Sequence, residues 1–228
     1  MSHPLDNPAF SALTGPQTRF ARRSGNALSY PLDVTIFSAL PDEPTEADWR
    51  DAAALVGPDG TLRLAGDQTS PPEGWETVML MDGVQMTGED VEPVLDSEAV
   101  RLTTADVPEM LDLVKRTKPG PFLPRTIELG AYLGIRRGGE LVAMAGERVH
   151  PLGWTEISAV CTDDAWRGHG FATRLIRALA AVIRDHGDIP FLHAAAVNTA
   201  AIGVYQAIGF RHRRDLIFSA FRPASTPR

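Results

Sequence analysis

The six residues Arg-Gly-His-Gly-Phe-Ala at positions 167–172 have the composition of an anion-binding turn. They lie between an apolar segment of strand character and a longer segment of helix character. At the start of a helix the backbone N–H groups lack partners within the helix, and the helix dipole adds positive potential. Gly168 and Gly170 carry no Cβ that would hold a ligand away from the backbone, and Arg167 adds a fixed cation with several donors. The segment therefore predicts a site for a phosphate or a pyrophosphate.

The turn by itself has more than one interpretation. A glycine pair before a helix can be a structural turn that binds nothing. The dinucleotide fingerprint GxGxxG fits poorly, because Thr173 stands where a third Gly or an Ala is needed and because the preceding strand belongs to an antiparallel meander. The P-loop pattern, GxxxxGK followed by Ser or Thr, does not occur. The elements around the turn therefore have to decide what it binds.

Patterns in the region 96–228 predict an α/β unit with a mixed sheet around the turn. Thr103 and Asp106 have capping-box spacing before an apolar stripe of helical period. The residues Phe171, Leu175 and Leu179 begin a second such stripe directly after the turn. In chain order the predicted elements are a strand fragment from Val100, a helix ended by residues 118–121, a second helix near 123–130, a hairpin over 131–149, a strand over 154–162, a helix over 171–187, a strand over 189–197, a helix over 199–208 and a strand over 214–221.

Residues 1–95 are rich in Pro and Gly and predict a smaller α/β region without a recognisable chemical motif. The acidic segment 87–99 lacks periodicity and predicts a linker. We therefore divide the chain into an N-terminal α/β region, 1–95, and a larger domain, 96–228, that carries the turn. The elements expected in the first part are a strand over 34–40, a helix over 45–57 that begins at Thr45, and strands within 60–67 and 75–86.

Composition and charge exclude several classes of protein. Hydrophobic residues make up 43% and charged residues 22% of the 228 residues, as in a soluble globular chain. The formal net charge of −7 disfavours nucleic acids and anionic membranes as partners and weakly favours a cationic acceptor. No apolar run of about 18 residues predicts a membrane span, and the N-terminus lacks a signal-peptide pattern. The lone Cys161 and the lack of metal-binding Cys/His spacing predict a cytoplasmic protein without a metal site.

The region 99–222 resembles the GCN5-related N-acetyltransferases (the GNAT superfamily), and its segment 155–170 is similar to the FR47-like branch in particular. The family's first motif, Q/R-x-x-G-x-G/A, is matched by Arg167, Gly170 and Ala172. A second motif, a strand followed by a short helix, is matched by Asn198, Tyr205 and Gly209-Phe210. The resemblance implies a GNAT acyl-CoA N-acyltransferase fold. It also raises the hypothesis that residues 1–95 are a degenerate half of the same fold.

The resemblance implies acetyl-CoA, or another short acyl-CoA, as the co-substrate. The strand before the turn would splay from the next one, and the amides of pantetheine would pair with the backbone left open at Val160, Cys161 and Thr162. Asn198 would hydrogen-bond the CoA arm and cap the next helix. Cys161 would then be a small core residue and not a nucleophile. The pyrophosphate would lie on Arg167, Gly168, His169, Gly170, Phe171, Ala172 and Thr173.

The resemblance also implies the catalytic groups. Tyr205 lies at the family's general-acid position, where a phenol with a pKa of about 10 can protonate the leaving thiolate. Without the resemblance, Tyr205 would be interpreted as a core aromatic residue. Glu156 lies where some members place a carboxylate base for the protonated amine, and His193 on the next strand is a second candidate. Direct transfer requires backbone donors for the oxyanion and no metal.

The sequence therefore predicts an acetyl-CoA-dependent N-acetyltransferase that acts on a small-molecule amine or amino acid. A catalytically inactive acyl-CoA-binding or regulatory module is the alternative, and a dinucleotide-dependent oxidoreductase fits the strand pattern badly. Two departures from the family pattern are Asp164, in a position that is often Pro, and His169, in a position that is usually more basic. The identity of the acceptor and the oligomeric state, a homodimer included, stay open.

Overall fold

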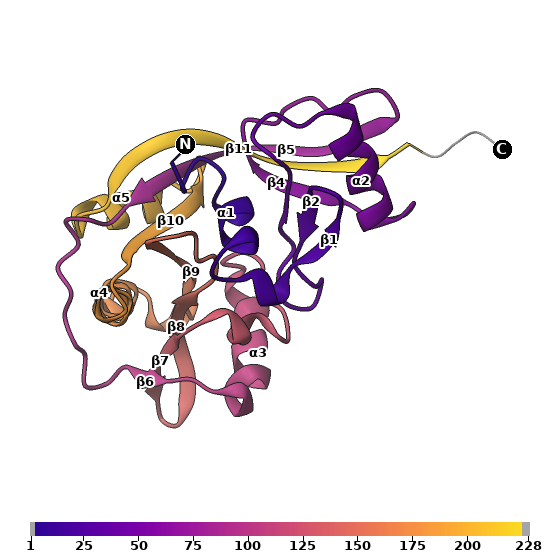
Figure 1. Ribbon diagram of the computed structural model, residues 1–228. Coiled ribbons are helices and arrows are strands. Elements are labelled where there is room, and N and C mark those ends of the chain that lie inside the picture. The colour runs from indigo at the N-terminus through magenta and orange to yellow at the C-terminus, as the bar shows by residue number, and fades with distance from the viewer. Residues whose placement is uncertain (1–2, 225–228) are drawn as a thin grey trace.

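One mixed sheet of eight strands forms the centre of the molecule. The computed structural model describes residues 3–224 (Figure 1). The strands lie in the order β4-β11-β5-β10-β9-β8-β7-β6, and all neighbours are antiparallel except β9 and β10. The mixed α/β sheet expected from the sequence is confirmed. The bounds of the strands are Leu62–Gly66 (β4), Arg211–Pro223 (β11), Trp75–Thr87 (β5), Ile189–Ala195 (β10), Trp154–Thr162 (β9), Glu140–Glu147 (β8), Tyr132–Arg137 (β7) and Val100–Arg101 (β6).

Two helices cover opposite faces of the strands that lead to the turn. α4 (Phe171–Asp185) packs on β7 to β10, and α3 (Val107–Thr117) packs on β8 and β9 from the other side (Figure 1). Within α4, Leu175, Leu179 and Ile183 are each at most 1% exposed. Burying a side chain of this size contributes roughly 1.5–3 kcal/mol, so the stripe fixes the start of α4, and with it the turn, against the sheet. No helix within residues 3–224 is long and apolar enough to cross a membrane.

Three local expectations differ from the structure. The helix expected near 123–130 is only a 3-10 turn, η3 (Thr126–Leu129), because the Thr126 hydroxyl binds backbone groups of Val34 and Leu123 in competition with a helix. The strand expected over 34–40 is reduced to β3 (Ser38–Ala39), because residues 31–35 form a turn in which two N–H groups donate to the Pro31 carbonyl. No pattern predicted α1 (Pro8–Thr14), which Asn7 caps.

The N-terminal region and the larger domain share the central sheet. A small sheet of β1 (Arg22–Ser24), β2 (Ala27–Ser29) and β3 packs with α1 and with α2 (Glu46–Val56). β4 and β5 follow, and both pair with β11, so that β5 lies between β10 and β11. The boundary expected near residue 95 therefore crosses a sheet to which both parts contribute strands.

The acidic segment expected as a linker lies as a strap, residues 88–99, across α4 (Figure 1). It contains neither helix nor strand. Arg174 donates to Asp96 (2.5 Å) and to Glu98 (2.6 Å), and Arg184 donates to the carbonyl of Glu89 (2.6 Å). The arginines on the polar face of α4 thus hold the strap in place.

Candidate active site

The turn begins α4 with a backbone conformation that favours glycine. Gly168 has a φ of +81°, and Gly170, the N-cap of α4, has a φ of +74°. Apart from chain neighbours, no described atom lies within 4 Å of a Cβ built on either residue, so both face open space. No side chain caps α4 within the described residues, so the N–H groups of its first turn are available to an anion. The turn thus has the geometry that a phosphate site requires.

The two aspartates before the turn both have arginine partners. Asp163 accepts from the N–H of Ala165 (3.1 Å) and from Arg116 (3.0 Å). Asp164 forms an exposed ion pair with Arg167 (2.7 Å). Exposed pairs of this kind contribute about 0–1 kcal/mol, so a phosphate could displace Asp164 from Arg167 at little cost.

β9 and β10 pair only near their beginnings. Their parallel register ends at the pair of Glu156 and Phe191, after which the strands separate. β9 then carries a bulge, where Ala159 has a φ of +53° and the register with β8 shifts. The bulge places Val160 in the α4 cluster and Cys161 in the α3 cluster. Among the described residues, the later part of β9 has no strand partner on its β10 side, so its backbone groups there are open to a ligand.

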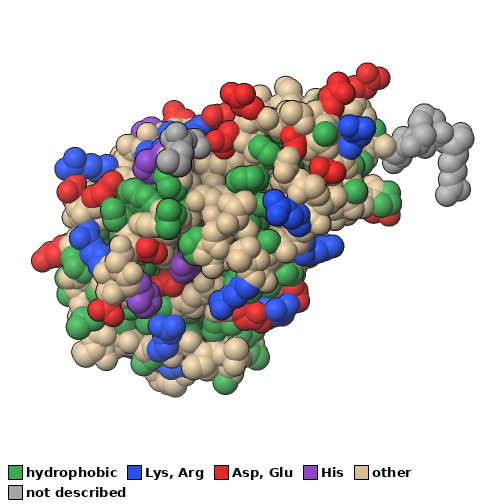
Figure 2. Space-filling model, in the orientation of Figure 1, with side chains coloured by type: hydrophobic (Ala, Val, Ile, Leu, Met, Phe, Trp, Pro, Cys, Tyr) green, Lys and Arg blue, Asp and Glu red, His purple; other side chains and the backbone are tan. Residues whose placement is uncertain are grey.

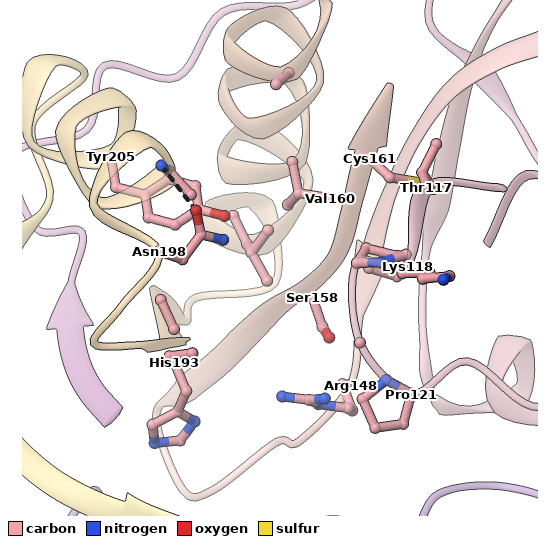
Figure 3. Close-up of a pocket in the computed structure, with 18 of the residues that line it drawn as sticks. Thr117, Lys118, Pro121, Arg148, Ser158, Val160, Cys161, His193, Asn198 and Tyr205 are labelled. Carbon is pink, nitrogen blue, oxygen red and sulfur yellow. Dashed lines mark hydrogen bonds between the residues drawn. The ribbon is translucent and has the colours of Figure 1, made fainter. Parts of the chain in front are cut away.

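A cleft of about 850 Å³ follows this open backbone (Figure 3). The turn forms one end, and residues of the N-terminal region and β11 form the other. Glu156 and His169 are the two predicted site residues that do not line it. The predicted residues that do line the cleft are Val160, Cys161, Thr162, Arg167, Gly168, Gly170, Phe171, Ala172, Thr173, Asn198 and Tyr205, and His193 lines it as well.

Tyr205 and Asn198 reach the cleft from α5 (Thr199–Ala207) and its N-cap (Figure 3). The side chain of Asn198 accepts from the N–H of Ala201 (3.3 Å), which is the cap expected from the sequence. The ring of Tyr205 packs against Phe210, with ring centroids 6.0 Å apart. Burial raises the pKa of the Tyr205 phenol, which keeps it protonated at neutral pH. An acid is therefore available beside the open backbone.

Glu156 belongs to a buried chain of hydrogen bonds. Its two oxygens accept from Nε (2.8 Å) and Nη2 (2.6 Å) of Arg148, and Oε1 also accepts from Nδ1 of His193 (2.7 Å). Nε2 of His193 lies 3.0 Å from Nε2 of Gln85, whose Oε1 accepts from Arg213 (2.7 Å). Because arginine only donates, Gln85 must turn its oxygen to Arg213 and its N–H to His193. Nε2 of His193 therefore accepts from Gln85 and Nδ1 donates to Glu156, so both ring nitrogens are occupied.

This network leaves neither candidate base free. Burial alone would raise the pKa of Glu156, but the charge and hydrogen bonds of Arg148, together with the bond from His193, hold it well below its ordinary value. The carboxylate is thus ionised, although it is 0% exposed. The side chain of His193 is 4% exposed, and Gln85 occupies its basic nitrogen. In this arrangement neither residue presents a free basic atom to the cleft.

Comparisons with known proteins bear on the family and the fold. The family model described as FR47-like protein matches residues 132–219. A structure from Novosphingobium aromaticivorans, described as a candidate acetyltransferase of the GNAT family, is 34% identical over 98% of this chain and 100% of its own, with a TM-score of 0.90. The chain belongs to the GNAT family. A GCN5-related N-acetyltransferase from Kribbella flavida has the same fold, with 18% identity, 95% of each chain covered and a TM-score of 0.61. No curated protein matches the sequence.

Membership of the GNAT family confirms the resemblance carried by the two motifs and supports acyl transfer as the general reaction class. The similarity to the Novosphingobium protein covers nearly the whole chain, so this GNAT architecture includes residues 1–95 as well as the domain with the motifs. Residues 1–95 are part of the architecture because they include β5, which lies inside the central sheet. Without residues 1–95 the sheet would lose this internal strand.

Cys161 has the properties of a core residue in this GNAT protein. It is 7% exposed and lies in the apolar cluster beneath α3. Burial raises the pKa of its thiol to about 11, so the thiol is protonated at neutral pH. A nucleophilic role therefore has no support in the structure.

Several cleft residues were not predicted from the sequence. Phe37 and Arg63 come from the N-terminal region, where no motif marks them, and Arg148 follows β8. The one available signal was the charged pair Glu147-Arg148 in an apolar hairpin strand, since charged residues in such a place need buried partners. Which partners they find depends on strands that are far apart in the chain.

Proposed function

We propose that this GNAT protein transfers an acetyl or other short acyl group from acyl-CoA directly to an amine. The observation that carries the proposal is one cleft that joins the anion-binding turn, the open backbone of β9 and the side chain of Tyr205. Each part suits a different portion of the co-substrate: pyrophosphate, pantetheine amides and thioester. A turn that only connected two elements would not require the strand beside it to open.

The chain's own residues would hold the co-substrate largely through backbone groups. The N–H groups of the turn, Arg167–Thr173, and the first turn of α4 would bind the pyrophosphate. The backbone of Val160–Thr162 would pair with the pantetheine amides as a further strand would. Asn198 would contribute the side-chain N–H groups that its capping bond leaves free.

Transfer would follow from this placement. The acceptor first loses its ammonium proton to water, because only the neutral amine has a lone pair. Its nitrogen then attacks the thioester carbon, a C–N bond forms, and the C–S bond breaks as the tetrahedral intermediate collapses. Tyr205 donates its proton to the departing sulfur and regains one from solvent, and the amine proton leaves to water. Open N–H groups of β9 would stabilise the oxyanion. The raised pKa of Tyr205 suits an acid that must stay protonated until the thiolate forms.

We assign Glu156 a positioning role in place of the base expected from the resemblance. The carboxylate does not line the cleft, and Arg148 and His193 lie on its oxygens. Its charge instead fixes the guanidinium of Arg148 and the ring of His193, both of which do line the cleft. Residues 1–95 would form the acceptor wall. A cytoplasmic location and a homodimer stay predictions.

A thiol-release assay with acetyl-CoA and a panel of amines tests the proposal. Tyr205→Phe should lower kcat at least about tenfold, since general acids contribute about 10² to 10⁴, while CoA affinity measured by calorimetry is unchanged. Tyr132→Phe is the matched control, because it removes a hydroxyl that is buried without a described partner and does not line the cleft. CoA binding without turnover of any amine would favour the inactive module, and no CoA binding would contradict both.

A further inference from the structure

The cleft has an end, here called the acceptor end, at the beginning of β9 and away from the turn. Two ring contacts locate it: Phe37 lies under the guanidinium of Arg148 (4.7 Å), and Phe218 packs edge-on to His193 (6.1 Å). Figure 3 shows Arg148 and His193 at this end, with Tyr205 further along. Met81, opposite Phe218 on β5, adds an apolar wall. A molecule that reaches the thioester from this end is surrounded by apolar side chains and a few polar groups.

Every fully charged side chain that lines the cleft is cationic. Arg167 belongs to the turn, and the others are Arg63, Lys118 and Arg148. No Asp or Glu of residues 3–224 lines the cleft. Within the same range, Arg63 and Lys118 form no ion pair. An additional ammonium group on the acceptor would therefore meet like charge, and an anionic group would meet opposite charge.

Arg148 is the most defined of these cations. It is 6% exposed, and the bidentate pair with Glu156 uses Nε and Nη2. The remaining amino group, Nη1, hydrogen-bonds to no described residue, although Arg148 lines the cleft. Nη1 is not among the buried side-chain atoms without a partner, so it is accessible from the cleft. A carboxylate oxygen there would accept a charge-assisted hydrogen bond from it. Stacking on Phe37 and pairing with Glu156 fix the direction of that donor.

We infer that the acceptor is a zwitterionic amine, an amino acid or a close analogue, whose carboxylate binds Nη1 of Arg148 with Arg63 as a second cation. The inference rests on the proposed function and adds the substrate class. It reverses the expectation of a cationic acceptor drawn from the net charge of −7. That charge is carried by surface carboxylates, which are interspersed with Lys and Arg on the face shown in Figure 2, and not by the lining of the cleft.

Matched pairs of acceptors test the inference. Thiol release from acetyl-CoA is measured with glycine and methylamine, alanine and ethylamine, leucine and isopentylamine, phenylalanine and phenethylamine, and with spermidine. For at least one pair, kcat/KM should be at least about tenfold higher for the amino acid, as expected for one added charge-assisted bond of about 1.5–3 kcal/mol. Equal or better turnover of the decarboxylated amines or spermidine would overturn the inference and leave the proposed function intact. Bound CoA without turnover of any amino acid would also overturn it, whereas absent CoA binding would refute the proposed function itself.

A variant links the preference to the cleft. Arg63→Met should lower the ratio of kcat/KM between an amino acid and its decarboxylated amine by about fivefold or more, with CoA affinity unchanged. Arg50→Met, an exposed arginine of α2 that does not line the cleft, is the control and should keep the ratio. An unchanged ratio in Arg63→Met, together with an unchanged ratio in Arg148→Lys, would contradict the assignment of these cations. Circular dichroism establishes that each variant is folded.

Discussion

Replacing Glu156 by Gln should destabilise the protein by about 3–5 kcal/mol, the usual cost of leaving a buried charge without its partner. Glu156 is fully buried and accepts two N–H groups from Arg148 and one from His193. Gln keeps the shape but removes the negative charge, and its amide N–H₂ would face donors of Arg148 or His193. Since about 1 kcal/mol shifts Tm by about 2–4 °C in a chain of this size, Tm should fall by roughly 6–20 °C.

A double-mutant cycle separates the ion pair from packing. Replacing both partners with apolar residues of similar volume, as in Arg148→Met with Glu156→Leu, is often neutral or stabilising. The double variant should therefore be more stable than either Glu156→Leu or Arg148→Met alone. Urea titrations and thermal melts followed by circular dichroism measure each variant. Glu140→Gln, on an exposed position of β8, is the control and should stay within about 0.5 kcal/mol of the wild type.

Two results would refute this reasoning. One is a Glu156→Gln variant within about 1 kcal/mol of the wild type, because the Arg148 charge would then have another partner. The other is a double variant no more stable than the single ones, because the cost would then come from volume and not from charge. Kinetics below Tm add a separate check: a positioning role predicts a raised KM for the acceptor, whereas a base would lower kcat and remove one limb of its pH profile.

Three further predictions follow from the same structure. The depressed pKa of Glu156 stabilises the folded state above the unfolded pKa near 4.3, and this stabilisation is lost as the pH falls below that value. Between about pH 5 and 3 the wild type should therefore lose more stability than the double variant. Urea titration at each pH measures the difference. Gly170→Ala should weaken CoA binding, measured by calorimetry, about tenfold. Gly138→Ala is the control, because Gly138 has a comparable positive φ in a hairpin turn outside the cleft. Both variants should lose roughly 1–2 kcal/mol of stability, but Gly138→Ala should leave CoA affinity unchanged. Cys161, with a pKa near 11 and little exposure, should resist iodoacetamide at pH 8 in the folded protein and react after denaturation, and rapid labelling of the native state would contradict its burial.

Local order along the chain determined much of what could be predicted. The turn at 167–172, the helix after it and the cap at Asn198 depend on neighbours within a few residues, and all three have the expected form in the structure. The capping box of Thr103 and Asp106 is present for the same reason. The expectations that failed were also local: the helix near 123–130 was displaced by a side-chain bond from Thr126 to Val34, which lies 92 positions away.

The sequence by itself indicated the family, and it predicted a co-substrate site at the turn, because the backbone conformation of that turn is set by adjacent residues. Only the tertiary structure decided the acceptor end. There β5 inserts between β10 and β11, Phe37 meets Arg148, and Gln85 meets His193, and each pairing joins segments that no local pattern connects. The packing of these strands also buries Glu156, and its side chain does not line the cleft. A carboxylate's role depends on what surrounds it, and a strand pattern cannot show whether the neighbour is water or the guanidinium of Arg148.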